Sequence, residues 1–206
     1  MARTRRLFLL SPADAGGERA TLLLRPGAIL PLARAVQSVQ GAPLGEVFSF
    51  ASGLYFRGKL AYAEAFARPP RGVPGCLVIT SSRGLIPAAT AITAADLRAL
   101  GGVPIDPRDA RYREPLERDA RALAEAAPRC EVVLLGSVAS GKYVDVLLSI
   151  FGERLLFPGA FVGRGDMSRG GLLLRCVRAG EELAYVKVAG AIRHGPRPPR
   201  LPQLPR

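Results

Sequence analysis

The sequence predicts an α/β fold: a three-layer domain with a mostly parallel, Rossmann-like sheet and a C-terminal β-hairpin. Three observations lead to this prediction. Short apolar runs at residues 7–10, 76–80 and 131–135 have the length and composition of buried strands. Segments between these runs repeat apolar residues with helical spacing. Small and polar residues follow each run, as at the carboxyl edge of a parallel sheet, where ligands bind in such folds.

The first third of the chain alternates short strands with helices. Residues 7–10 form the first expected strand, and residues 21–24 form a second that ends at an Arg-Pro-Gly turn. Residues 28–39 have helical spacing, and residues 46–50 have the composition of a strand. A helix is expected at residues 55–67, where two consecutive prolines close to its end stop it.

The middle of the chain holds the clearest elements. The strand expected at residues 76–80 precedes a proline-bearing loop with a short helix at residues 94–100. The best helical pattern covers residues 114–127, where the apolar residues form one stripe and Pro115 suits the first turn. A further buried strand is expected at residues 131–135.

The last quarter changes character. A helix at residues 142–151 and a short strand at residues 154–157 are followed by a glycine-rich stretch, residues 161–171, that we expect to be a loop. Residues 171–177 and 182–188 are two apolar runs separated by Arg-Ala-Gly-Glu, and this arrangement predicts a β-hairpin.

Length and hydropathy indicate one soluble domain. The chain has 206 residues, enough for a single well-buried core, and we assign residues 1–192 to that domain. Residues 193–206 are rich in Pro and Arg, and we expect an extended or disordered tail there. No apolar run reaches the roughly 18 residues of a membrane span. We therefore expect a cytoplasmic protein without a membrane partner; the sequence does not indicate an oligomeric state.

The cysteines and the single histidine exclude several classes of chemistry. Cys76, Cys130 and Cys176 lie far apart in or beside apolar runs, which is typical of buried thiols in a reducing compartment. His194 lies at the edge of the Pro/Arg tail. The sequence therefore excludes Ser-His-Asp, Cys-His and histidine-rich metal sites, and we expect neither a metal nor a cofactor.

The formal net charge of +12 is concentrated at the two ends of the chain. Seven of the 29 positive charges are arginines near the two ends, and all 17 acids lie between the two groups: Arg3, Arg5 and Arg6 at the front, and Arg193, Arg197, Arg200 and Arg206 at the back. Such an excess favours RNA, DNA or an anionic ligand such as a nucleotide as the partner. The chain has 26 Arg and 3 Lys, so a GC-rich genome is an equally open explanation. Neither basic end interleaves the aromatic residues that single-strand binders use for stacking.

One glycine-rich loop has most of a phosphate-binding motif. Residues 136–142 follow a strand, precede a helix and match G-x4-G-K. A P-loop would have Ser or Thr next to hold Mg²⁺, whereas this chain has Tyr143. A nucleoside triphosphatase is therefore disfavoured. A looser anion site with Ser137, Ser140 and Lys142 and a plain tight turn both remain open.

Other loops supply further candidates for a ligand or anion site. The glycine-rich stretch at residues 163–171 offers arginines for bidentate contacts, and two cations occupy the start of the helix at residues 55–67, where an anion would be favourable. The acids nearest these loops, Asp14, Glu18, Asp145 and Asp166, have no spacing that forces a catalytic pair. Together with the loops after the strands, these segments give the remaining candidates: Ser11, Asp14, Arg57, Lys59, Ser81, Ser82, Arg83, Arg164, Ser168 and Arg169.

The order of these pieces resembles the α/β domain of archaeosine synthase and of related uncharacterised bacterial proteins. The resemblance rests on a strand that ends in Ser-Pro, on the segment Leu-Tyr-Phe-Arg-Gly-Lys-Leu-Ala-Tyr-Ala at residues 54–63, and above all on residues 76–87. It implies a Rossmann-like domain that acts on nucleosides or nucleic acid. The turn that supplies Cys and Lys in those proteins has Ala, Asp and Gly here, so the synthase activity is not carried over.

Three functions remain open on the sequence. The first is a domain that binds a nucleoside, a nucleotide or nucleic acid and is linked to RNA or nucleoside modification, with or without a reaction of its own. The second is a non-catalytic, basic interaction protein. The third is an enzyme that acts on a small phosphorylated metabolite. The first predicts that the loops at residues 11–19, 81–84 and 136–142 meet in one pocket.

Overall fold

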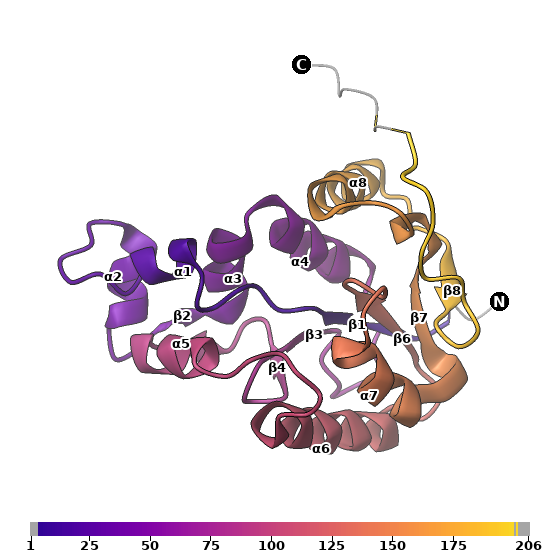
Figure 1. Cartoon of the computed structure of the whole chain (residues 1–206), viewed down its shortest axis with the longest axis horizontal. Coiled ribbons are helices and arrows are strands. Elements are labelled where there is room, and N and C mark those ends of the chain that lie inside the picture. The colour runs from indigo at the N-terminus through magenta and orange to yellow at the C-terminus, as the bar shows by residue number, and fades with distance from the viewer. Residues whose placement is uncertain (1–3, 200, 202–206) are drawn as a thin grey trace.

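The structure is a computed structural model, and it describes residues 4–199 and 201 of the chain. Among these residues a six-stranded sheet carries helices on both faces, so the predicted three-layer, mostly parallel fold is confirmed (Figure 1). Four parallel strands form its centre, and one antiparallel strand lies at each edge. In spatial order the strands are β4 (Leu85–Pro87), β3 (Cys76–Ile79), β1 (Arg6–Leu10), β6 (Glu131–Leu135), β7 (Leu155–Pro158) and β8 (Tyr185–Lys187).

Strand β1 lies between β3 and β6 and contributes to both halves of the core. Phe8 and Leu10 pack into the core on one face of the sheet, and Leu7 and Leu9 pack into the core on the other face. Their alternation follows from the two-residue period of a strand, and all four side chains are fully buried. A run of four apolar residues therefore identifies a strand that is covered on both sides.

The helices divide between the two faces of the sheet. Helices α3 (Leu44–Ser52), α4 (Leu54–Phe66) and α8 (Asp166–Ala179) lie on one face, and α6 (Ala110–Ala126) and α7 (Gly141–Phe151) lie on the other (Figure 1). Two short 3-10 turns, η1 (Gly152–Arg154) and η2 (Gly159–Phe161), flank β7. None of the helices in the described part of the chain is both long and apolar enough to cross a membrane.

Shorter elements gather beyond the carboxyl ends of the parallel strands. They are α1 (Glu18–Leu22), α2 (Pro31–Gln37), α5 (Ala94–Gly101) and the two-stranded sheet of β2 (Ala42–Pro43) and β5 (Ala91–Ile92), seen at the left of Figure 1. Thr93 accepts a hydrogen bond from the backbone N–H of Asp96, and the Asp96 carboxylate accepts one from the backbone of Thr93, so a capping box begins α5.

Two strands expected in the first third of the chain are helical. Residues 21–24 lie in and just after α1, and residues 46–50 lie within α3. The segment at 46–50 has the composition of a strand, but the consecutive residues Val47 and Phe48 are both buried on the same helix. Packing against α4 and the sheet outweighs the β-propensity of Val and Phe here.

The prediction of the C-terminal hairpin is also wrong in its residues, because the first arm is helical and the second arm pairs with a different strand. Residues 166–179, which cover most of the expected glycine-rich loop and the first arm of the hairpin, form the single helix α8. The second arm is present as β8, but it pairs antiparallel with β7. The chain therefore ends in an antiparallel strand pair as expected, with a helix inserted between its two members.

A close crossing of α4 and α8 explains why the helical segment contains glycines. A Cβ added at Gly170 would lie 2.7 Å from the Leu54 carbonyl oxygen and 2.8 Å from the Tyr55 Cα. A Cβ added at Gly58 would lie 2.7 Å from the carbonyl oxygen of Gly170. These distances are shorter than real Cβ contacts, so the two backbones approach this closely because neither position carries a side chain.

We expect Gly170→Ala to destabilise the fold by about 1–3 kcal/mol, because the new methyl group meets backbone atoms that cannot move aside. Gly171→Ala is the matched control on the same helix, since the nearest atom to its new methyl group is a Leu201 side-chain carbon at 3.7 Å. That control should be neutral or slightly stabilising. Urea unfolding of both variants measures the difference, and equal stabilities would contradict the close crossing.

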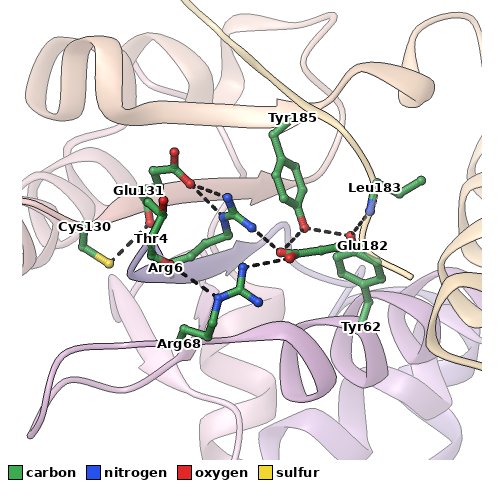
Figure 2. Close-up of polar contacts among 9 residues, drawn as sticks. All are labelled: Thr4, Arg6, Tyr62, Arg68, Cys130, Glu131, Glu182, Leu183 and Tyr185. Atoms are coloured by element: carbon green, nitrogen blue, oxygen red, sulfur yellow. Dashed lines mark hydrogen bonds and ion pairs between the residues drawn. The ribbon is translucent and has the colours of Figure 1, made fainter. Parts of the chain in front are cut away.

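A charged network ties the chain ends together at the amino ends of the parallel strands (Figure 2). Arg6 on β1 binds both Glu131, at the start of β6, and Glu182, just before β8. Arg68 donates to the second oxygen of Glu182 at 2.8 Å, and the Tyr185 hydroxyl donates to the first at 3.0 Å. Glu182 thus accepts from three groups that the sequence places far apart.

We expect Glu182→Gln to destabilise the protein by about 1–3 kcal/mol at pH 7, because two partly buried arginines lose their shared carboxylate. Burial raises the pKa of Glu182, but hydrogen bonds from Arg68 and Arg6 outweigh this effect and lower the pKa below its ordinary value of 4.5. The loss should therefore shrink as the pH falls below 4.5 and the native carboxylate becomes protonated.

Glu153→Gln is the matched control for this network. Glu153 pairs with Lys187 at 2.8 Å, and both side chains are more than half exposed, so removal of that charge should change the stability by less than about 1 kcal/mol. Urea unfolding at pH 7 and pH 3.5 compares the two variants. Equal losses of stability in the two variants at pH 7 would show that the partly buried Glu182 network stabilises the fold no more than an exposed ion pair does.

Candidate functional site

A pocket of about 540 Å³ opens at the carboxyl ends of β1 and β6, and we call it the β1–β6 pocket. Its wall comes from the turn after β1, from residues 104–105, from the loop after β6, and from the beginnings of α4, α7 and α8. Polar or charged side chains from all three helix starts, from both turns and from the last residue of α3 line it: Ser11, Asp14, Ser52, Tyr55, Ser137, Lys142, Tyr143 and Asp166. Three helices thus direct their amino ends, which favour negative charge, toward one hollow.

Lys59 lies in the interior directly behind this wall. It extends from α4, is 1% exposed, and its Nζ donates hydrogen bonds to the Ser11 carbonyl oxygen at 2.5 Å and to the Ser11 Oγ at 2.8 Å. The ammonium group also lies 4.6 Å from the ring centre of Tyr55 and 4.8 Å from that of Phe56. Burial lowers the pKa of Lys59 to about 7, so much of it is the neutral amine at physiological pH.

Ser11 is the residue through which this buried lysine reaches the pocket. It follows the last residue of β1, and its backbone N–H donates to the carbonyl oxygen of Leu135 on β6. Its side chain is shared between Lys59 behind it and Tyr143 beside it. Ser11 is 6% exposed, so its hydroxyl is held almost completely by protein while still lining the pocket.

Two tyrosines complete the inner wall. The Tyr143 hydroxyl accepts a hydrogen bond from the backbone N–H of Ser137 at 3.2 Å, which leaves its own proton to donate. The Tyr55 hydroxyl is buried with the Arg169 guanidinium close to it. Burial raises the pKa of Tyr55, while the charge of Arg169 and a hydrogen bond from its guanidinium oppose that rise. The hydroxyl is thus enclosed by protein, and Tyr55 shapes the inner wall of the pocket rather than offering a free polar group to a ligand.

Helix α8 adds a charged pair to the rim. Arg169 is buried, donates twice to the carbonyl oxygen of Phe161, and lies 3.3 Å from the Asp166 carboxylate. Asp166 lines the pocket and is mostly exposed. Arg169 therefore holds the start of α8 in place and orients Asp166 toward the opening.

Lys142 supplies the exposed cation of the pocket. It is the second residue of α7, whose N-cap residue Ser140 makes no capping hydrogen bond with its side chain. The first amide groups of that helix are thus left for other partners. On the opposite side, Asp14 accepts a hydrogen bond from the backbone N–H of Gly16 at 3.1 Å, which fixes the turn after β1.

The predicted site residues divide between this pocket and other places. Ser11, Asp14, Ser137 and Lys142 line the β1–β6 pocket, and Lys59 lies behind it. Ser81 bonds the carbonyl oxygen of Leu100 in a neighbouring hollow of about 360 Å³ that shares the turn after β1. The loops after β1 and β6 therefore share one pocket, whereas the loop after β3 lines the neighbouring hollow, so the three loops do not meet in a single pocket as the first functional hypothesis predicts.

The other candidates lie outside the β1–β6 pocket. Arg83 pairs with Asp96 at 3.1 Å, and Ser82 lies beside it in the turn between β3 and β4. Arg57 is exposed on α4, and Ser140 is the N-cap of α7. Arg164 bonds Ser168 and the backbone of the C-terminal segment rather than the pocket. Arg3, Arg200 and Arg206 of the predicted basic ends lie outside the described residues.

The list of candidates predicted from the sequence does not include Tyr55, Tyr143 or Asp166. Tyr143 has a visible signal, since it occupies the position at which a P-loop has Ser or Thr. Asp166 falls within the predicted glycine-rich loop, because the glycines around it conceal the start of α8 in the sequence. The burial of Lys59 has no signal in the sequence, where Arg57 and Lys59 look equivalent.

A second hollow, of about 590 Å³, lies at the other end of the sheet beside the charged network of Figure 2. Its charged residues, Arg6, Arg68 and Glu182, are already paired with one another. Within the described residues, no group of three or more His, Cys, Asp or Glu side chains is placed to hold a metal ion. The β1–β6 pocket is therefore the better candidate for a functional site.

Comparisons of the chain with protein-family models, with curated proteins and with solved structures found no match. The resemblance to the archaeosine synthase domain therefore stays a prediction.

We expect the stability of the protein to depend on pH through Lys59. Its pKa in the folded chain is about 7 against an ordinary value of 10.5, so the unfolded chain binds more protons between these values. The free energy of unfolding therefore rises with pH in this range, by about 2 kcal/mol between pH 7 and pH 9 from this group. Lys59→Met removes the effect, so the unfolding free energies of wild type and variant should converge or cross as the pH rises.

Urea unfolding of both proteins at several pH values measures this difference, because all other titrating groups are shared. Lys142→Met, a change at an exposed lysine, serves as the control and should run parallel to wild type. A Lys59→Met curve that also runs parallel would contradict the low pKa.

Proposed function

We propose that this chain binds a small polar molecule carrying a phosphate or carboxylate group, with nucleosides and their phosphates as the first class to consider. The observation that carries the proposal is the convergence of three helix starts and an exposed lysine on one pocket. Helix amino ends and a lysine favour an anionic group. The volume of about 540 Å³ lies in the range of pockets that hold small ligands.

The distribution of charge around the pocket suggests how such a ligand would lie. Lys142 and the first amides of α7 favour the anionic group on the β6 side. Asp14 and Asp166 line the same pocket from other elements, and carboxylates accept hydrogen bonds from hydroxyl or amino groups of a ligand. A molecule with an anionic group and several hydroxyl or amino donors fits both parts, and a nucleoside monophosphate is of this kind.

We expect AMP to raise the melting temperature more than adenosine or inorganic phosphate, because AMP reaches both parts of the pocket. Lys142→Gln should weaken AMP binding about tenfold and leave adenosine binding unchanged, and Asp14→Asn should weaken both. Thermal shift across a panel of nucleosides, nucleotides and sugar phosphates, followed by calorimetry on the best ligand, measures these effects.

Lys187→Gln is the control for this experiment, because Lys187 is an exposed lysine on β8 that pairs with Glu153 outside the pocket. It should bind every ligand as wild type does. Failure of the whole panel to shift the melting temperature would contradict the proposal. Salt-sensitive binding of an RNA oligonucleotide that Lys142→Gln leaves unchanged would instead favour the basic interaction protein.

A further inference from the structure

We propose that Ser11 and Lys59 form a catalytic pair that hydrolyses an ester or amide bond, with Ser11 as the nucleophile and Lys59 as the general base. This inference rests on the proposed function in one respect, that the substrate enters the β1–β6 pocket. It adds a reaction and a substrate class: a carboxylic ester or amide of a small polar molecule. The geometry that supports it is the direct contact between a pocket-lining hydroxyl and an amine buried behind it.

The placement of the two groups meets the requirement for an activated serine. A serine hydroxyl is a weak nucleophile until a neighbouring base removes its proton within hydrogen-bond reach. The Lys59 Nζ lies 2.8 Å from the Ser11 Oγ, inside that range. His194, the single histidine of the sequence, belongs to the C-terminal segment, so histidine does not provide this base.

The surroundings of Lys59 keep much of it in the form that a base needs. The rings of Tyr55 and Phe56 cover it from its own helix. From α8, Asp166 favours the charged form and Arg169 opposes it, and from β3 the thiol of Cys76 favours the charged form weakly. Burial outweighs these influences, and a pKa of about 7 leaves a free amine that accepts a proton near neutral pH.

The second hydrogen bond of Lys59, to the Ser11 carbonyl oxygen at 2.5 Å, fixes the direction of the pair. Because the same amine holds the backbone and the side chain of one residue, the Ser11 hydroxyl has little freedom to rotate away. The Ser11 backbone N–H is bonded to Leu135 on the neighbouring strand. The nucleophile is therefore positioned by the sheet and by its base together, as preorganised sites require.

The reaction balances with water as the only co-reactant. The Ser11 Oγ attacks the carbonyl carbon while the Lys59 amine takes the hydroxyl proton, and an oxyanion forms. When the intermediate collapses, the bond to the leaving alcohol or amine breaks and the Lys59 ammonium protonates that group, which leaves an acyl group on Ser11. Water then attacks the acyl carbon and gives its proton to Lys59; the carboxylic acid departs as Lys59 returns a proton to the Ser11 Oγ.

Tyr143 has a place in the same sequence of steps. Its hydroxyl hydrogen-bonds the Ser11 side chain and accepts a hydrogen bond from the Ser137 backbone, so it lies within reach of a carbonyl group that Ser11 attacks. A donor in that position stabilises negative charge on the attacked carbonyl oxygen. We assign Tyr143 to the oxyanion for this reason, and Tyr143→Phe should slow acylation without removing Ser11.

The test uses a fluorophosphonate probe, which forms a covalent bond with activated serines, and p-nitrophenyl acetate as a simple ester. We expect wild-type protein to be labelled at Ser11, identified by peptide mass mapping. Ser11→Ala should abolish labelling, and Lys59→Met should slow it at least about a hundredfold, as loss of a general base does. The labelling rate of wild type should rise with pH and level off above a midpoint near 7.

Ser149→Ala and Lys187→Met are matched controls. Ser149 bonds the Val146 carbonyl on the exposed side of α7, and Lys187 pairs with Glu153, so both should react as wild type does. Circular dichroism confirms that each variant is folded, and the pH profile tests the wild-type chain without any substitution. Labelling at a residue other than Ser11, or a Ser11 labelling rate that Lys59→Met leaves unchanged, would overturn the catalytic pair.

The outcomes also separate this inference from the proposed function. AMP binding retained by Ser11→Ala, together with loss of labelling, supports both. Labelling of Ser11 that depends on Lys59, without binding of any ligand in the panel, keeps the catalytic pair and rejects the proposed ligand class. Binding of AMP without any reaction at Ser11 keeps the pocket and rejects the catalytic pair.

Discussion

The close approach of α4 to α8 is the constraint on which the pocket depends. Gly58 and Gly170 allow the two backbones to meet, and each helix carries its share of the site one turn or less away. Helix α4 brings Tyr55 and Lys59, and α8 brings Asp166 and the buried Arg169. If either glycine carried a side chain, the helices would separate, and water would reach the interior where Lys59 is now almost wholly desolvated.

That desolvation has opposite effects on stability and on chemistry. An amine in a nearly apolar interior makes the folded chain less stable at neutral pH than an apolar side chain of the same size would. The same burial lowers the pKa of the amine, so that its neutral form is present near neutral pH and can accept a proton. The two cores on either side of the sheet, which meet along β1, supply the stability that offsets a buried lysine.

Sequence reasoning recovers the parts of this fold that are governed by local patterns. The strands at β1, β3 and β6 are identifiable because every residue of a strand covered on both faces is apolar. Helices α6 and α7 are identifiable because one stripe faces the sheet. Residues 46–50 and 171–177 are predicted wrongly because their composition favours strands. Contacts with α4 make them helical, and a short stretch of sequence does not reveal those contacts.

The candidate site shows the same division. Ser11, Ser137 and Lys142 are predictable, since they follow strands whose carboxyl ends meet at one edge. The distinction between Arg57 and Lys59 is not predictable, because two residues of helical rotation place one in solvent and the other against Ser11. The role of Tyr55 likewise depends on the start of α8, which is visible only once the helix is known to exist.

The central position of β1 has a consequence for how the chain folds. Its first residue, Arg6, pairs with Glu131, which is 125 positions later in the chain. Strand β1 is synthesised well before its neighbour β6 and waits for it, and long-range pairing of this kind folds slowly. During that interval the apolar run at residues 7–10 is open to association with other chains, and Arg5 and Arg6 beside it act as charged gatekeepers. Arg6, which later joins the network around Glu182, thereby protects the nascent chain before that network exists.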